Sequence, residues 1–193
     1  MKKILIGTHN KGKFKEISYL ISKKIKKVSP ISLKIKSPRE TGKTFEENAK
    51  LKANYFSKFT HLPVISDDSG LCIKSLNNKP GIYSARWAKK YGSFYRAMKT
   101  ILKKIKDKKK DRSAFFICSL SFKDSKGKVT TVTGKINGSI SYKITGDRGF
   151  GYDPIFIPQS KSSTFGQMTK SKKAKIDHRF IAFKKLKKKV KIL

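Results

Sequence analysis

Segments with the helical period and segments with the two-residue period of a strand follow one another along almost the whole chain. A short apolar strand over residues 2–6 leads through a polar loop into residues 14–21, whose apolar side chains recur at helical spacing. Alternating residues predict a half-buried strand over 31–35, and Thr44 with Glu47 forms a capping box before the next helix. This mixture of elements predicts an α/β fold.

The same mixture continues through the middle of the chain. Residues 62–65 are typical of a buried strand, which we expect to enter a carboxylate-rich turn over 66–70 and to be followed by another strand over 71–73. The remaining expected elements are a helix over 94–105, the two strands of an antiparallel hairpin over 113–122 and 128–133, and a closing helix after Ser171.

Length and composition favour a single domain. The 193 residues, 37% of them hydrophobic, are enough to bury a core, and neither a repeat nor a long linker interrupts residues 1–193. Cys72 and Cys118 lie far apart without the paired spacing of a metal or redox site, so we expect core thiols. We see no secretory signal and no run of about 18 apolar residues, and expect a cytoplasmic protein without a membrane segment.

The net charge of +36 comes from 48 basic residues against 12 acidic ones. Such a charge is typical of proteins that bind polyanions, and a nucleic-acid-binding protein is one possible interpretation. Only six of the 48 are arginine, the lysines are dispersed, and the aromatic residues lie mainly in periodic apolar segments. We therefore favour solvated lysines and expect no specific nucleic-acid partner.

Two short segments carry candidate chemistry. The loop after Gly7 opens a helix and could bind phosphate through backbone N–H groups, with Thr8, Asn10 and Lys13 beside it, although a plain turn would also explain it. Asp67 and Asp68 follow a buried strand, where carboxylates can hold Mg²⁺, although an ordinary aspartate turn is the alternative.

Two later segments are weaker signals. Residues 149–154 place two glycines around an aromatic pair and Asp153, which could stack on a base, but a hairpin turn has the same composition. His178 and Arg179 could reach anions or base carbonyls, but a surface pair without a role is the simpler interpretation of an isolated His-Arg.

Taken together and in order, six blocks of the chain resemble the non-canonical purine nucleoside-triphosphate pyrophosphatases, the inosine triphosphatase family. The resemblance spans almost the whole chain, and six blocks at compatible distances are far more specific than any one of them. The blocks are residues 8–13, 40–49, 66–71, 80–86, 150–154 and 178–179.

This resemblance implies an α/β fold with an elongated central mixed β-sheet flanked by helices, two lobes around a nucleotide cleft, and a homodimer. It also implies a hydrolase that uses Mg²⁺ to convert inosine, deoxyinosine and xanthosine triphosphates (ITP, dITP, XTP) to the monophosphate and pyrophosphate. Such an enzyme prevents the incorporation of these nucleotides into DNA and RNA.

The resemblance also assigns roles to individual residues. Asp68 is expected to hold magnesium and to orient or deprotonate the attacking water, with Glu40 as a second metal ligand and Asp67 assisting. Lys13 and Lys52 are expected to neutralise the charge that builds on the phosphates. The expected substrate-binding residues are Thr8, His9, Asn10, Lys11, Gly12, Lys13, Ser69, Phe150, Gly151, Tyr152, Asp153, Lys173, His178 and Arg179.

The chain departs from the family pattern at a few positions. Asp177 replaces the usual serine before His178, Arg39-Glu40 reduces an acidic pair, and Lys172 stands where an acid is common. A pyrophosphatase of the Maf type, acting on pyrimidine or modified nucleotides, is the alternative among enzymes. The Phe-Gly-Tyr-Asp and His-Arg blocks favour the purine enzyme.

Overall fold

The computed structural model describes residues 2–107 and 111–190, which divide into two compact units. The first unit comprises the described residues up to Asp68, residues 118–134 and the described residues from Arg179 on. The second comprises the described residues of 69–117 and residues 135–178. Three long strands contribute residues to both units.

The first unit is built on a mixed sheet in the strand order β2-β1-β3-β5-β6. β1 pairs in parallel with both β2 and β3, whereas β5 and β6 form a hairpin whose hydroxyls pair between Ser121 and Thr131. The hairpin confirms the prediction from the sequence. The strands are β1 (Lys3–Ile6), β2 (Lys26–Val28), β3 (Val64–Ile73), β5 (Ser113–Lys123) and β6 (Val129–Ile140).

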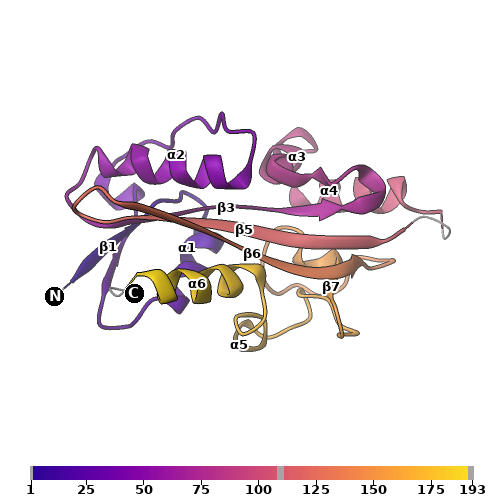
Figure 1. The fold of residues 1–193 in the computed structure, drawn as a ribbon. Helices are drawn as coiled ribbons and strands as arrows, with labels where there is room; N and C mark the ends of the chain where they lie inside the picture. Colours follow the sequence, from indigo (N-terminus) through magenta and orange to yellow (C-terminus); the bar gives the residue numbers. More distant parts are fainter. Residues whose placement is uncertain (1, 108–110, 191–193) are drawn as a thin grey trace. The chain divides into compact units, whose positions relative to one another are not determined.

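Helices cover both faces of the first unit's sheet (Figure 1). The alternation along β1 explains why, because Ile4 and Ile6 point to one face and Leu5 points to the other. Helices α1 (Lys11–Leu20) and α6 (His178–Lys189) pack on the face of Ile4 and Ile6. Helix α2 (Phe45–Ser57) covers the opposite face, where Phe56 contacts the cluster that contains Leu5. The predicted capping box is present in part: the Thr44 side chain accepts from the Glu47 N–H, but the Glu47 carboxylate accepts from the Lys43 N–H, one residue before the position that a full capping box uses.

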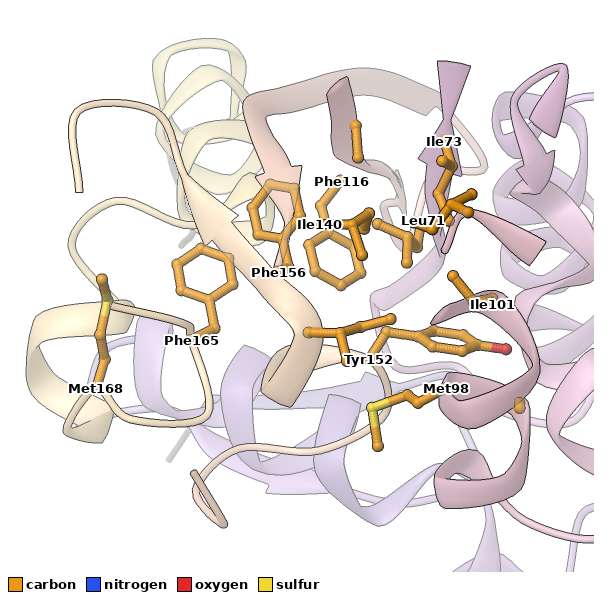
Figure 2. Packing of buried hydrophobic residues seen from close by; sticks show 14 residues of the cluster. Leu71, Ile73, Met98, Ile101, Phe116, Ile140, Tyr152, Phe156, Phe165 and Met168 are labelled. Carbon is orange, nitrogen blue, oxygen red and sulfur yellow. The ribbon is translucent and has the colours of Figure 1, made fainter. Parts of the chain in front are cut away.

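In the second unit the strand order is β3-β5-β6-β7, with β4 pairing antiparallel to β3. Its core joins Leu71 and Ile73 of β3 to Met98 and Ile101 of α4, and Figure 2 shows these side chains within one cluster. Phe116, Phe156 and Phe165 fill the other part of this core, with ring centroids of Phe116 and Phe156 4.7 Å apart. The elements here are β4 (Lys79–Pro80), β7 (Phe156–Pro158), α3 (Ser84–Lys90), α4 (Phe94–Lys104) and α5 (Lys170–Lys173), with short 3₁₀ turns at 74–76, 81–83 and 153–155.

Arg112 fastens the start of β5 within the second unit. Its Nε donates to the Ile140 carbonyl at 2.7 Å and its Nη1 donates to the Ile105 carbonyl at 3.0 Å. Its Nη2 donates to the Ser141 carbonyl, and the Tyr142 ring lies 4.3 Å from the guanidinium carbon. One side chain therefore satisfies three backbone carbonyls where three segments meet.

Three expected elements differ from those observed. Residues 31–35 do not form a strand; Ile31–Leu33 is a 3₁₀ turn that ends at Lys34 in the left-handed region. The expected turn at 66–70 is also absent, because β3 runs without interruption from Val64 to Ile73 and carries both aspartates inside it. The expected closing helix is divided into α5 and α6 by residues 174–177.

The mixed sheet with helices on its faces confirms the predicted α/β class. Cys72 and Cys118 are both buried and form no disulfide, as predicted for core thiols. Within residues 2–107 and 111–190, no helix has the length and hydropathy needed to cross a bilayer.

Candidate active site

The loop between β1 and α1 forms the helix start that the sequence predicted. Asn10 is the N-cap of α1, and its Oδ1 accepts from the Lys13 N–H at 3.0 Å. The Thr8 hydroxyl in turn accepts from the Asn10 N–H at 3.2 Å. This local bonding holds Lys13 in the first turn of α1, where its side chain can leave the helix toward the sheet.

Lys13 points at the two aspartates of β3. Its Nζ lies 3.2 Å from Asp67 Oδ2 and 4.0 Å from Asp68 Oδ1. Arg179 approaches Asp67 from α6, with Nη2 3.2 Å from the same Oδ2, while its Nη1 is paired with Glu16 of α1. Asp67 is fully buried, so this pairing with two cations is what makes an ionised carboxylate acceptable inside the sheet.

The two neighbouring aspartates differ in their ionisation. Burial favours the neutral form of Asp67, but Lys13 and Arg179 outweigh it and hold the pKa of that carboxyl well below its usual range. Burial raises the pKa of Asp68, and Lys13 and Lys52 offset that effect only in part. Burial also disfavours the charged form of Lys13, but Asp67 and Asp68 reverse this and raise its pKa. Asp67 is thus a fixed negative charge, while Asp68 is poised to take up a proton or a cation.

Helix α2 supplies further neighbours of Asp68. Asn48 donates from Nδ2 to Asp68 Oδ2 at 3.1 Å, and Lys52 places its Nζ 3.9 Å from Asp68 Oδ1. Lys52 also donates to Glu40 Oε1 at 2.5 Å, which brings the loop before α2 to the same place. We call this group the carboxylate cluster; its members are Lys13, Glu16, Glu40, Asn48, Lys52, Asp67, Asp68 and Arg179.

The donor set of the carboxylate cluster fits a magnesium ion. Glu40 and Asp68 approach the same Lys52 ammonium, so two carboxylates share one small region. No three His, Cys, Asp or Glu side chains in the described part of the chain form a metal cage by themselves. Magnesium is commonly bound by one or two carboxylates together with waters and substrate phosphates, which matches a site of this kind.

A second group of predicted residues comes together in the second unit. Lys173 Nζ donates to Asp153 Oδ2 at 2.5 Å, and the same oxygen accepts from the Phe150 N–H at 2.8 Å. The Lys173 ammonium also lies 5.2 Å from the Phe150 ring centroid and 5.3 Å from that of Phe165. Gly149 has φ +76°, and a Cβ there would lie 2.1 Å from Asp153 Oδ2, so only glycine allows this turn.

His178 joins the same group through an aromatic contact. Its ring stacks on Phe116 with centroids 4.8 Å apart and planes 11° from parallel, and the residue is almost fully buried. Tyr152 donates its hydroxyl to the Ser84 carbonyl at 3.0 Å, which turns it into the core rather than outward. We call this group the aromatic cluster; its members are Phe116, Phe150, Asp153, Phe165, Lys173 and His178.

The other predicted site residues have less marked surroundings. His9 bonds through Nε2 to the Ile35 carbonyl at 2.9 Å, and Lys11 is exposed on the first turn of α1. Ser69 is half-buried in β3, and Gly151 has φ +68° beside the Phe94 ring. Asp177, the departure from the family pattern, is buried just before His178.

Two members of the carboxylate cluster were not among the predicted site residues. Glu16 lies three residues after Lys13 in α1, and Asn48 lies four residues before Lys52 in α2. Both spacings place a side chain on the same helix face as a predicted lysine. Helical spacing counted from the lysines could have marked both as candidates, although it does not give their partners on other elements.

Comparison with known proteins gives a consistent picture. The model of the Ham1 family matches residues 4–189 of the chain. A dITP/XTP pyrophosphatase of Dictyoglomus thermophilum is 44% identical over 189 residues, covering 95% of this chain and 92% of its own length. A dITP/XTP pyrophosphatase of Bacillus subtilis is 40% identical over 192 residues, covering 97% and 96%.

Solved structures show the same relationship at the level of the fold. A HAM1 protein from Coxiella burnetii superposes with a TM-score of 0.87 at 32% identity, over 100% of both chains. The Ham1 protein of Staphylococcus aureus gives a TM-score of 0.85 at 34% identity, over 98% of both chains.

Proposed function

The chain belongs to the Ham1 family, and we propose that it hydrolyses non-canonical purine nucleoside triphosphates, ITP, dITP and XTP, to the monophosphate and pyrophosphate. It is a nucleoside-triphosphate pyrophosphatase that acts on the bond between the α and β phosphates. Relatives that cover nearly the whole chain carry the name dITP/XTP pyrophosphatase, and this favours the purine reaction over that of the Maf-type enzymes.

The observation that carries the reaction chemistry is the placing of Asp68 between two lysines. Its Oδ1 is 3.9 Å from Lys52 Nζ and 4.0 Å from Lys13 Nζ. A triphosphate drawn to these two ammonium groups would bring a phosphorus atom near a carboxylate that can accept a proton from water. The lysines would then offset the negative charge that develops as the bond to the leaving pyrophosphate breaks.

Asp68 and Glu40 are the proposed magnesium ligands. When bound there, the ion would supply further positive charge to the phosphate oxygens and lower the pKa of water. Asp67 contributes differently, because Lys13 and Arg179 already contact it, and it holds Lys13 in place. Residues 8–13 are proposed to contact the phosphates, with Ser69 as a further substrate contact.

The aromatic cluster is the proposed site of the purine base. Phe150 offers a ring for stacking, and the backbone around Gly151 and Tyr152 would frame the base edge. His178 is the better candidate to donate to the 6-oxygen that distinguishes inosine from adenosine, since both Nη atoms of Arg179 contact carboxylates. The idea fails if His178→Ala and Arg179→Ala each leave the preference for ITP over ATP unchanged.

Further properties are proposed on the resemblance to this family. They are a homodimer, a cytoplasmic location, and one catalytic domain over residues 1–193 that holds the nucleotide. Specific nucleic-acid binding is not proposed, because the lysines are dispersed along the sequence.

The test is an assay that separates pyrophosphate from orthophosphate. Purified protein is incubated with Mg²⁺ and ITP, XTP, ATP or GTP, with Asp68→Asn as the control. We expect pyrophosphate from ITP and XTP only, and none from the variant. Orthophosphate as the product, or equal turnover of all four nucleotides, would contradict the proposed function.

A further inference from the structure

Asn48 is a buried polar residue of the carboxylate cluster. No role for it was predicted from the sequence. It lies on α2 one turn before Lys52 and is fully buried. A buried amide is costly unless its oxygen and nitrogen both find hydrogen-bond partners. The partners of Asn48 therefore indicate what the residue does.

Each end of the Asn48 amide has one defined partner. Its Oδ1 accepts from the Gly42 N–H at 2.8 Å, and its Nδ2 donates to Asp68 Oδ2 at 3.1 Å. Because a backbone N–H can only donate, the amide oxygen must face Gly42, and the NH₂ group must face Asp68. The amide cannot be flipped without losing both bonds.

Gly42 comes unusually close to Asn48. A Cβ at Gly42 would lie 2.7 Å from Asn48 Oδ1 and 2.8 Å from Glu47 Cβ, closer than atoms can approach. The loop that passes here carries Glu40 two residues earlier, and Glu40 bonds to Lys52. Asn48 thus fastens this loop and Asp68 to the same point on α2.

The two carboxylate oxygens of Asp68 have different neighbours. Asn48 bonds to Oδ2, while the Nζ atoms of Lys52 and Lys13 both lie near Oδ1. An aspartate carboxylate rotates over a broad range about its last torsion unless a neighbour holds it. The bond from Asn48 removes that freedom and presents Oδ1 to the two lysines.

We propose that Asn48 is a positioning residue for the hydrolysis, which fixes the Asp68 carboxylate through Oδ2 so that Oδ1 meets the attacking water. This inference rests on the proposed pyrophosphatase function. Asn48 itself makes no contact with substrate in this scheme. Its loss should therefore lower kcat and leave nucleotide binding almost unchanged, because small misplacements of a reacting group slow catalysis strongly.

The first test is Asn48→Asp. The new carboxylate can still accept from the Gly42 N–H, but it places an oxygen in place of the NH₂ donor that faces Asp68. We expect kcat on ITP to fall on the order of 30-fold, the effect of losing one hydrogen bond to a charged group. The matched control is Asn54→Asp, which adds the same charge to the same helix at a side chain that bonds Lys123 instead.

Binding is measured without turnover by calorimetry with the α,β-methylene analogue of ITP. We expect Asn48→Asp to lose less analogue affinity than kcat relative to Asn54→Asp, although its new charge lies beside Asp68 whereas that of the control lies beside Lys123. Asn48→Ser, which is uncharged, gives a second measurement if the first variant does not fold. We expect its kcat to fall similarly, with analogue affinity within about threefold of the wild type.

Three outcomes would overturn the inference. One is a kcat in both variants within about threefold of the wild type, and another is a loss of analogue affinity as large as the loss of kcat. The third is a loss of kcat fully explained by a lower folded fraction, measured by thermal melting. If the wild type has no turnover on any nucleotide, the proposed function itself is wrong and the inference falls with it. If the wild type is active and the variants are unimpaired, only the role of Asn48 is refuted.

Discussion

The carboxylate cluster and the aromatic cluster both bury charge, but they balance it in different ways. The carboxylate cluster contains four acids, Glu16, Glu40, Asp67 and Asp68, and three cations. These are four of only 12 acidic residues in the chain. The aromatic cluster contains the ion pair of Asp153 with Lys173, placed beside two rings.

This difference indicates which cluster can change its charge during a reaction. In the carboxylate cluster, the raised pKa of Asp68 and two nearby lysines leave room for a proton, a cation or a phosphate to be exchanged. In the aromatic cluster, Asp153 and Lys173 form a 2.5 Å ion pair, and Asp153 also accepts from the Phe150 N–H, which fixes the turn there. Substitutions in the first should therefore change kcat, and substitutions in the second should change KM.

The largest expected effect is the loss of turnover in Asp68→Asn. We expect kcat on ITP to fall by about 10³ or more, because the variant loses both the proton acceptor and a metal ligand. KM should change far less, since Lys13 and Lys52 remain to bind phosphate. Steady-state kinetics at saturating Mg²⁺ measure both constants, and a variant with nearly normal kcat would remove Asp68 from the mechanism.

Asp67→Asn tests whether the buried negative charge of Asp67, next to Asp68 in β3, stabilises the fold. We expect the free energy of unfolding at pH 7 to fall on the order of 3 kcal/mol, because Lys13 and Arg179 lose the carboxylate that they share. The folded-state pKa of Asp67 is lowered, so its stabilisation is complete above its unfolded pKa of about 3.9 and is lost as the pH falls below that value.

Urea denaturation of the wild type and Asp67→Asn at pH 7 and pH 3 measures this effect. The difference between the two proteins should be large at pH 7 and smaller at pH 3. A difference that does not depend on pH would mean that packing, and not the charge of Asp67, explains the loss.

Phe150→Leu tests the aromatic cluster. We expect KM for ITP to rise roughly tenfold, the cost of losing one stacked base, with kcat within about twofold of the wild type. The control is Phe59→Leu, an exposed phenylalanine of the first unit, which should change neither constant. If Phe150→Leu lowered kcat more than it raised KM, the division of roles between the clusters would be wrong.

The smallest expected effect is a gain of stability in Asp68→Asn without substrate or metal. The raised pKa of Asp68 means that its ionised form costs folding free energy, a cost present at pH 7 and absent once the pH falls below the unfolded pKa. We expect the variant to be more stable by about 1 kcal/mol at pH 7, opposite in sign to Asp67→Asn. Thermal melting in the presence of a chelator measures it, and a loss of stability would contradict the assignment.

Sequence patterns predicted the elements that have strong periodicity and failed where local and tertiary preferences compete. The predicted strand over 31–35 is a 3₁₀ turn because Ser29 and Ser32 bond to each other's backbone around Pro30. The residues from Ser66 to Gly70 have the composition of a turn, yet they continue β3. Pairing of Asp67 with Lys13 and Arg179, which is not visible in a local pattern, makes that strand possible.

The candidate site was predicted in outline for a related reason. The resemblance to the inosine triphosphatase family assigned roles to Lys13, Lys52 and Asp68, and the structure brings these three side chains together. Glu16 and Asn48 were missed because their roles depend on partners 163 and 20 residues away in sequence, Arg179 and Asp68. Only the folded chain brings those partners together.

The contacts of Arg112 and Arg179 have an evolutionary consequence. Arg112 uses three guanidinium nitrogens and Arg179 uses two, whereas a lysine has a single nitrogen and cannot reproduce either arrangement. The chain has 48 basic residues, of which only six are arginine. At most surface positions we therefore expect weak selection against substitution of arginine by lysine. At Arg112 and Arg179 we expect strong selection against that substitution. Among related chains of similar lysine content, arginine should therefore be conserved at these two positions.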